Sequence, residues 1–220
     1  MLKLYGFAVS NYYNMVKLVL LEKGIEFETV NVFGKQDEAF KAVSPRGKVP
    51  CLETPEGIIT ETSVIVEYLE ECYPAPALLP SHPQARAYVR SLMREIELYI
   101  ELAARPCYPK AFFGGPLDAS IAARSQLELT EGIRAFKRHA QFAPYVAGSE
   151  FTLADVYLLY SLDLAVGVSS RVFGEDLLAD WPQARNWLAL MGQNPHVQKI
   201  AKDKDTELKN YLEAKRQGLA

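Results

Sequence analysis

The sequence predicts two domains of different fold class, an α/β domain followed by an all-helical domain. Short β-like runs alternate with helical patterns up to residue 74. Prolines are dense between residues 75 and 84, and beyond them helical patterns continue with almost no strand signal. The chain has 220 residues, of which 49% are hydrophobic, so it can form a substantial core. We therefore expect an α/β domain at 1–74, a linker at 75–84 and a helical domain at 85–220.

The first domain is predicted to begin with a β-α-β unit. Residues 2–7 (LKLYGF) and 25–32 (IEFETVNV) have β-like patterns. Between them, residues 14–24 (NMVKLVLLEKG) carry an apolar helical stripe that stops at Gly24. A second helix is expected around 37–43.

A hairpin and a helix complete the predicted first domain. The runs VPCLET (49–54) and IIT (58–60) are close together and separated by a Pro-Glu-Gly turn, which predicts two paired strands. The next helix is expected to start near Thr62. The predicted order is therefore β-α-β-α-β-β-α.

The second domain is predicted to be a bundle of helices. The start of the helix expected at 153–166 is well defined, because Thr152 precedes it and Asp155 follows Thr152 by three residues, as in a capping box. We interpret Asp155 as a capping acid rather than a catalytic one, and we expect Phe151 to pack onto Val156. The helical patterns cover 84–104, 119–141, 153–166, 183–193 and 195–214.

Composition argues against several classes of function. The net charge is −3 and the Lys and Arg residues are scattered, so we expect no nucleic-acid partner. Cys51, Cys72 and Cys107 form no C-x-x-C pair and the three histidines are far apart, so neither disulfides nor a metal site is expected. No targeting pattern and no run of about 18 apolar residues is found, so we expect a cytoplasmic protein that does not enter a membrane.

Two backbone features indicate a binding site for a small peptide. Pro50 lies inside the apolar run GKVPCLE, where proline cannot donate a ladder hydrogen bond. A cis bond before it would turn the backbone of Val49 toward an extended peptide. Further on, ETS lies where a strand ends and a helix begins, so N–H groups and the Thr62 hydroxyl can hold an anion, while Glu61 can bind an ammonium group. A ligand with a carboxylate and an amine at one end and a peptide group in its middle satisfies both places.

Several segments in this order resemble the cytosolic glutathione transferase superfamily, over the whole chain. They are SNYYNMVKLVLLEKGIEFE, SPRGKVPCLET, ETSVIVEYLEECYP, LLP and FTLADVYL. The resemblance implies a thioredoxin-like first domain, a helical second domain, a homodimer and glutathione as co-substrate. It further implies that Glu61 and Thr62 bind the γ-glutamyl end of glutathione and that Val49, before Pro50, binds its cysteinyl backbone. Lys48, and less specifically Lys35, is implied near the glycyl carboxylate.

Two departures from the commonest family pattern affect the site. Thr62 stands where serine is usual, which keeps the hydroxyl and adds a methyl group. Asn11 follows Ser10 where proline is frequent, so the shape of the first loop is open. Ser10 matches the family's catalytic serine, and a hydroxyl that donates to a sulfur favours the thiolate. Tyr5 falls near the tyrosine that other classes use, although a packed strand aromatic is the other interpretation.

The second substrate is expected to be a hydrophobic electrophile. Tyr12 and Tyr13 are interpreted as pocket residues or as alternative hydroxyl donors. Core packing is the other interpretation of the remaining aromatic residues that we assign to the pocket, and Cys51 is interpreted as a small buried hydrophobe. The absence of a cysteine at position 10 argues against the family's cysteine-dependent variants. The expected pocket residues are Tyr12, Tyr13, Tyr99, Tyr108, Phe112 and Phe113.

The resemblance leaves more than one activity open. The chain is expected to be a transferase, with detoxification as its role. A glutathione-dependent isomerase or peroxidase, and a non-catalytic binding or regulatory protein of the same fold, are the alternatives, because a fold does not determine a function.

Overall fold

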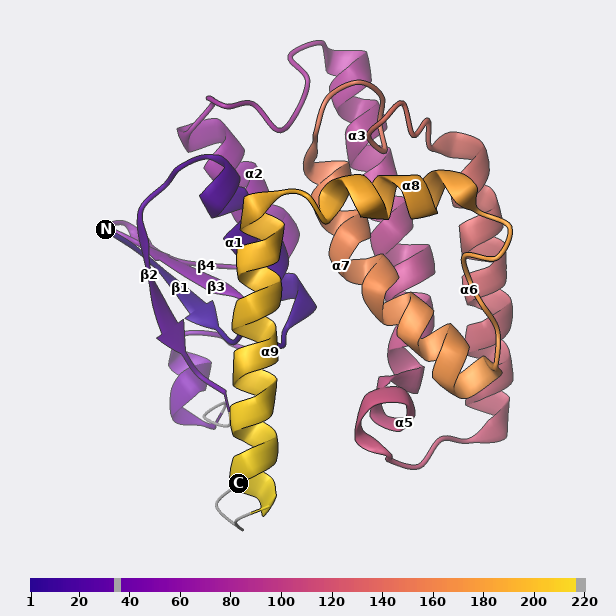
Figure 1. The fold of residues 1–220 in the computed structure, drawn as a ribbon. Helices are drawn as coiled ribbons and strands as arrows, with labels where there is room; N and C mark the ends of the chain where they lie inside the picture. The colour runs from indigo at the N-terminus through magenta and orange to yellow at the C-terminus, as the bar shows by residue number, and fades with distance from the viewer. Residues whose placement is uncertain (34–36, 217–220) are drawn as a thin grey trace. The chain divides into compact units, whose positions relative to one another are not determined.

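The chain forms two compact units in the computed structural model, which describes residues 1–33 and 37–216 and omits the side chains of 211, 212 and 214–216. The first unit consists of Met1–Ala77 together with Gly192–Ala220, and the second of Leu78–Met191. Figure 1 labels their helices and strands.

A four-stranded mixed sheet forms the centre of the first unit. Its strands are β1 (Leu2–Gly6), β2 (Phe27–Asn31), β3 (Cys51–Thr54) and β4 (Gly57–Thr60), in the order β2-β1-β3-β4. β1 and β2 are parallel, whereas β3 is antiparallel to both β1 and β4. The predicted β-α-β unit and the hairpin are therefore confirmed.

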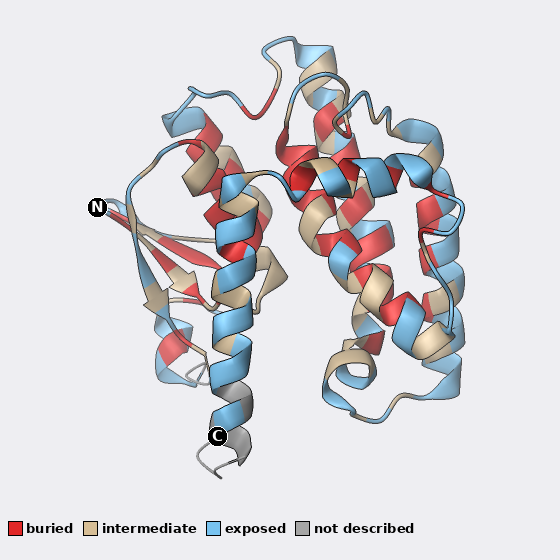
Figure 2. Ribbon diagram, in the orientation of Figure 1, coloured by how far each residue is buried: buried red, intermediate tan, exposed pale blue. Residues whose placement is uncertain are grey.

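Two α-helices accompany the sheet in this part of the first unit: α1 (Asn11–Glu22) connects β1 to β2, and α2 (Thr62–Cys72) follows β4. They pack against each other, and burial follows their inner faces and the central strands (Figure 2). Lys23, just after α1, forms a fully buried ion pair of 2.6 Å with Glu70 of α2. Its Nζ also donates to the carbonyls of Tyr73 and Pro76 at 2.7 and 2.8 Å, so every charge in this buried contact is compensated.

The sheet has two different faces near the predicted site. On one face Leu4 and Leu52 are fully buried. Gly6 of β1 lies so close to the Tyr13 ring of α1 that an added Cβ would be 2.1 Å from it. On the other face Tyr5 packs against the cluster of Val32, Phe40 and Cys51.

The helix expected around 37–43 is shorter than predicted. The structure has only a 3₁₀ turn, η1 (Ala39–Ala42). Asp37 begins it by accepting the Phe40 N–H at 3.1 Å, and Phe40 anchors it in the cluster beside Tyr5. This single buried side chain replaces the apolar stripe of a longer helix.

The last helix, α9 (Pro195–Arg216), belongs to the first unit. It packs against α1, where Lys17 forms an ion pair of 2.8 Å with Asp203 and Asn194 donates to Glu22 at 2.6 Å. This division differs from the expected domain at 85–220. Sequence order groups α9 with the preceding helices, whereas its side-chain partners lie near the N-terminus.

Helices alone make up the described second unit. All of the helical patterns predicted within it are confirmed with small shifts at their ends, and α5 was not predicted because prolines surround it. Gly132 allows the backbone at Tyr99 to approach closely, since a Cβ at position 132 would lie 2.1 Å from the Tyr99 carbonyl oxygen. The elements are α3 (Pro83–Glu95), the π-helix η2 (Ile96–Glu101), α4 (Leu102–Ala104), η3 (Arg105–Cys107), α5 (Tyr108–Phe113), α6 (Ala119–His139), α7 (Leu153–Val168), the π-helix η4 (Ser169–Phe173) and α8 (Pro182–Met191).

The capping box predicted at the start of α7 is confirmed. Thr152 accepts the Ala154 N–H at 3.3 Å, and the Asp155 carboxylate accepts the Thr152 N–H at 2.9 Å. Asp155 also accepts the Val146 N–H at 2.9 Å and the Trp187 indole N–H at 2.8 Å. Burial raises the pKa of Asp155 above its ordinary value, against the opposing effect of these hydrogen bonds.

The stretch Leu153–Phe173 is long and apolar enough to cross a membrane by length and composition. It is apolar on average but is no unbroken apolar run, since it contains Asp155, Asp163 and Arg171. Half of its most apolar window is buried inside the protein, as in the core helix of a globular unit. Asp155 at its start is fully buried and hydrogen-bonded.

Candidate functional site

The junction between β4 and α2 carries the first part of the candidate site. Glu61 has a φ of +69° and is exposed, and Thr62, the first residue of α2, is buried. A positive φ is uncommon for a residue other than glycine, and such strain is concentrated at functional sites. The unpaired N–H groups of the first turn of α2 make this junction suitable for an anion.

The segment before β3 carries the second part of the site. The Val49–Pro50 bond is cis, as predicted. Val49 is half-buried and packs against the cluster beside Tyr5. Its N–H and C=O form no hydrogen bond within the described part of the chain. This backbone is therefore available to an extended ligand, as an additional strand would be.

The structure describes only one of the two lysines expected at this site. Lys48 is exposed, and its backbone N–H donates to the Ser44 hydroxyl at 2.9 Å. That contact holds the backbone just before Val49 while the Lys48 ammonium stays in solvent. Lys35 lies outside the described residues.

The loop after β1 presents Ser10 at the start of α1. Ser10 is half-buried, and its hydroxyl oxygen accepts the Tyr13 N–H at 3.4 Å, which is longer than an ordinary N–H···O hydrogen bond. The Ser10 O–H donates to no acceptor among the described residues. The capping role of Ser10 thus leaves its proton available for a ligand atom.

Tyr5, the alternative to Ser10, has its hydroxyl directed elsewhere. The phenol donates a short hydrogen bond to Glu53 of β3, which also forms an ion pair of 2.7 Å with Lys3. The Glu53 contact raises the pKa of the Tyr5 phenol, with burial adding to the effect. The lysine and the tyrosine both lower the pKa of Glu53, so the carboxylate is a stable acceptor for the Tyr5 hydroxyl.

Cys51 is fully buried in the cluster beside Tyr5. Burial raises the pKa of its thiol, which disfavours the reactive thiolate. The interpretation of Cys51 as a small buried hydrophobe is therefore confirmed. No group of residues suited to hold a metal ion occurs within 1–33 and 37–216.

The aromatic residues expected around the second substrate lie in both units. Tyr12 and Tyr13 are on α1; Tyr12 is half-buried, and Tyr13 is 4% exposed and packed on Gly6. In the second unit, the rings of Tyr108 and Phe112 make an edge-to-face contact, with their centroids 5.5 Å apart. Tyr99 in the same unit is half-exposed.

A cavity of about 420 Å³ lies in the first unit beside the loop that carries Ser10. Its walls are the end of β1, α1, β2 and α9. Residues of α9 were not predicted near the site, because no local pattern in the sequence connects this helix to the N-terminal loop. The lining residues are Gly6, Phe7, Ala8, Tyr13, Lys17, Thr29, Asn31, Lys202, Asp203, Thr206, Glu207 and Asn210.

Comparison with known proteins matches both parts of the chain to one family. The family model described as the N-terminal domain of glutathione S-transferase matches residues 4–77, and the one described as its C-terminal domain matches residues 118–190. A glutathione S-transferase from Pseudomonas putida is 51% identical over 99% of both chains.

Two further similarities involve an isomerase. A maleylpyruvate isomerase from Ralstonia is 33% identical over 80% of this chain and 85% of its own length. A holo structure of maleyl pyruvate isomerase, described as a bacterial zeta-class glutathione S-transferase, has a TM-score of 0.73 and 31% identity. It covers 90% of this chain and 95% of the other.

Proposed function

This chain belongs to the glutathione S-transferase family, and from that premise we propose that Ser10 activates the thiol of bound glutathione. The protein is an enzyme that transfers the glutathione thiolate to an electrophile. The observation that carries the Ser10 assignment is the contrast between two hydroxyls. The Ser10 proton has no acceptor among the described residues, whereas Tyr5 donates to Glu53.

Glutathione is proposed to bind along three backbone segments of the first unit. Its γ-glutamyl carboxylate would bind the N–H groups and hydroxyl at Thr62, and its amine would bind Glu61. Its cysteinyl backbone would pair with Val49, held before Pro50, and its glycyl carboxylate would lie near Lys48 and Lys35. The free backbone of Val49 and the strained φ of Glu61 support this arrangement.

The chemistry follows from the protonation state of the sulfur. A hydroxyl that donates to sulfur stabilises the thiolate more than the thiol. Lowering a thiol pKa from about 8.5 by about two units requires about 2.7 kcal/mol of this preference. The hydroxyl of Ser10 and the positive end of the α1 dipole are the groups that we expect to provide it. The thiolate then attacks the electrophile.

We expect the electrophile to be a hydrophobic small molecule. Tyr12, Tyr108 and Phe112 are half-buried, and such aromatic side chains suit the wall of an apolar pocket. Tyr99 is 52% exposed, so it can also contact a ligand. Tyr13 is the weakest of these candidates, because its ring packs on Gly6.

Isomerisation is the second candidate activity. The similarity to maleylpyruvate isomerase favours it, since addition and later release of glutathione at a double bond would use the same thiolate. A chain that isomerises maleylpyruvate but conjugates no aromatic electrophile would support this alternative. A lack of saturable heat on titration with millimolar glutathione would instead favour a non-catalytic binding protein.

A homodimer in the cytoplasm is the proposed state of the protein. Family membership supports the dimer, as do two exposed apolar side chains of the first unit, Ile58 and Val64, which suit a covered surface. Light scattering at the mass of one chain would contradict the dimer, and recovery of the protein in a membrane fraction would contradict the cytoplasmic location.

Ser10→Ala is the test of the catalytic assignment. The thiolate absorbance of bound glutathione should titrate at higher pH, because the variant loses the hydrogen bond to sulfur. Conjugation of a generic aromatic electrophile at neutral pH should fall about tenfold for each 1.36 kcal/mol lost. Affinity for glutathione should change by only about a few-fold, because the contacts at Thr62 remain.

Tyr5→Phe is the matched control for Ser10→Ala. It removes the competing hydroxyl at almost constant volume and leaves Glu53 paired with Lys3. We expect its pH–rate profile to match that of the unaltered protein. A shifted profile in Tyr5→Phe with an unchanged one in Ser10→Ala would move the catalytic hydroxyl to Tyr5.

A further inference from the structure

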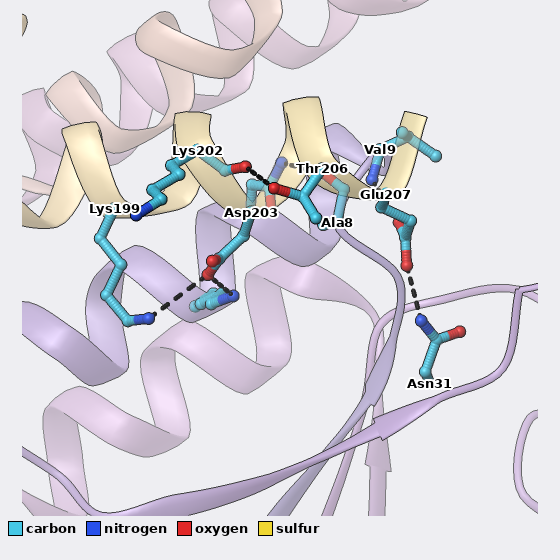
Figure 3. A network of polar contacts seen from close by, with 10 residues as sticks. Ala8, Val9, Asn31, Lys199, Lys202, Asp203, Thr206 and Glu207 are labelled. Atoms are coloured by element: carbon cyan, nitrogen blue, oxygen red, sulfur yellow. Dashed lines mark hydrogen bonds and ion pairs between the residues drawn. The ribbon is translucent and has the colours of Figure 1, made fainter. Parts of the chain in front are cut away.

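Glu207 of α9 binds the loop that carries Ser10, across 198 residues of sequence. One oxygen of its carboxylate accepts the Val9 N–H at 3.0 Å, and the other accepts the Asn31 amide N–H at 2.6 Å. Figure 3 shows Glu207 on α9 beside Val9, with its carboxylate directed at Asn31. The residue bonded to Glu207 is therefore the immediate neighbour of Ser10.

The other hydrogen bonds of this loop are local. The Ser10 N–H donates to the Phe7 carbonyl at 3.0 Å, and the Ala8 carbonyl accepts the buried Asn14 amide N–H at 2.8 Å. Among the described residues, Glu207 is thus the distant partner that fixes the backbone of residues 7–10. A loop held only by its own turn and by α1 would retain more conformational freedom.

Asn31 orients the carboxylate that Glu207 presents. The Asn31 side-chain oxygen accepts the Phe33 N–H at 2.9 Å, so its amide nitrogen faces Glu207 as a donor. Asn31 ends β2 and pairs in register with Gly6 at the end of β1. The Glu207 carboxylate therefore connects the loop to the edge of the sheet.

The helix that carries Glu207 is anchored independently of the loop. Asp203, one helical turn earlier, forms an ion pair of 2.8 Å with Lys17, whose side chain is 8% exposed. Lys199 approaches the same carboxylate at 3.5 Å (Figure 3). The Lys17 pair joins α9 to α1, the Lys199 contact lies within α9, and neither involves residues 7–10. Anchoring of the helix and fixation of the loop can therefore be separated by mutation.

We propose that Glu207 is a positioning residue that sets the placement of the Ser10 hydroxyl through the Val9 N–H. This inference rests on the proposed role of Ser10. A hydrogen bond weakens steeply with distance and angle, so a loop that moves freely donates less effectively to sulfur. The contribution of Glu207 is geometric, because its negative charge by itself would oppose a thiolate.

The experiment compares Glu207→Ala with Asp203→Asn in the full chain. In Glu207→Ala the midpoint of the glutathione thiolate titration should rise, and kcat at neutral pH should fall about threefold or more, as expected for one hydrogen bond. The Kd for glutathione should stay within about twofold, since the Thr62 end is untouched. Asp203→Asn should lower the melting temperature but leave the thiolate midpoint unchanged.

Exchange of donor and acceptor between Glu207 and Asn31 separates the geometric role of Glu207 from its charge. Glu207→Gln alone keeps an acceptor for Val9 but directs an amide donor at the Asn31 amide, so a partial shift of the midpoint is expected. Adding Asn31→Asp supplies an acceptor for that donor while the Phe33 N–H keeps its partner. The double variant should restore the original midpoint, a rescue that loss of stability alone would not produce.

The outcomes distinguish the two proposals. If the unaltered protein shows a lowered midpoint for the thiolate titration and Glu207→Ala has the same midpoint, the role of Glu207 is overturned and that of Ser10 is not. The absence of a lowered thiolate titration in the unaltered protein overturns both this role and that of Ser10. A shift of equal size in Asp203→Asn would also overturn the inference, because the effect would then belong to α9 as a whole.

Discussion

Two carboxylates, one in each unit, hold the backbone of a loop to a helix. They differ in how far they are buried. Asp155 is fully buried and accepts N–H groups from Val146, Thr152 and Trp187. Glu207 is half-buried on α9 and accepts N–H groups from Val9 and Asn31. A buried acceptor leaves its donors without water when it is lost, whereas solvent can replace a half-exposed one. The comparison indicates that Asp155 maintains the fold, while Glu207 refines a site.

Asp155→Asn should have the largest effect on stability. The substitution keeps the shape but turns an amide donor toward buried N–H groups, so we expect a loss of about 2–4 kcal/mol in the free energy of unfolding. Urea unfolding measures it. Asp205→Asn, at an exposed position of α9, is the control and should change stability by about 0.5 kcal/mol or less. Equal losses of unfolding free energy in the two variants would show that Asp155 does not maintain the fold, and the contrast with Glu207 would then fail.

Thr152→Ala should have an intermediate effect. It removes the hydroxyl that caps α7 and leaves Asp155 bonded to the Thr152 N–H. The expected loss is about 1–2 kcal/mol of unfolding free energy, with normal turnover in the folded fraction. Thr152→Ser keeps the hydroxyl and should lose much less. Unchanged melting together with lost activity would show that this cap serves the chemistry rather than the fold.

The ion pair between Asp203 and Lys17 should have the smallest effect, about 1 kcal/mol or less. Burial acts to raise the pKa of Asp203, but the hydrogen bonds and charges of Lys17 and Lys199 together outweigh it, so the pKa is lowered. A lowered pKa of an acid in the folded state means that the stability is present above the unfolded pKa of about 4. It is lost as the pH falls through the lowered value.

Unfolding at several pH values tests this sign. The difference in unfolding free energy between the unaltered protein and Asp203→Asn should be constant above about pH 5 and shrink toward about pH 3. A difference that grows in acid would show that Asp203 is not stabilised by Lys17. It would also weaken the view that α9 is anchored separately from Glu207.

Sequence reasoning succeeded where the determining interactions are local. The pair Thr152 and Asp155 is separated by three residues, a spacing that places both at one helix start. The cis bond at Val49–Pro50 was predicted because proline is incompatible with an ordinary ladder position. The helix expected at 37–43 was wrong in length, because one buried side chain, Phe40, anchors only a 3₁₀ turn.

Contacts between distant segments required the tertiary structure. The partner of the Tyr5 hydroxyl is Glu53, which follows from the pairing of Lys3 with Glu53 in the β1–β3 register. Sequence alone left both Tyr5 and Ser10 open as thiol activators, because it does not specify that register.

The amino-acid sequence by itself determined the β-α-β unit, the hairpin, most of the helices, the cap of α7 and the family to which the chain belongs. These depend on residue spacings of a few positions, where the backbone geometry limits the possible contacts. Only the tertiary structure decided that α9 joins the first unit and that Glu207 bonds to Val9. Such a contact depends on the packing of whole helices, and no local periodicity encodes which loop a distant carboxylate will reach.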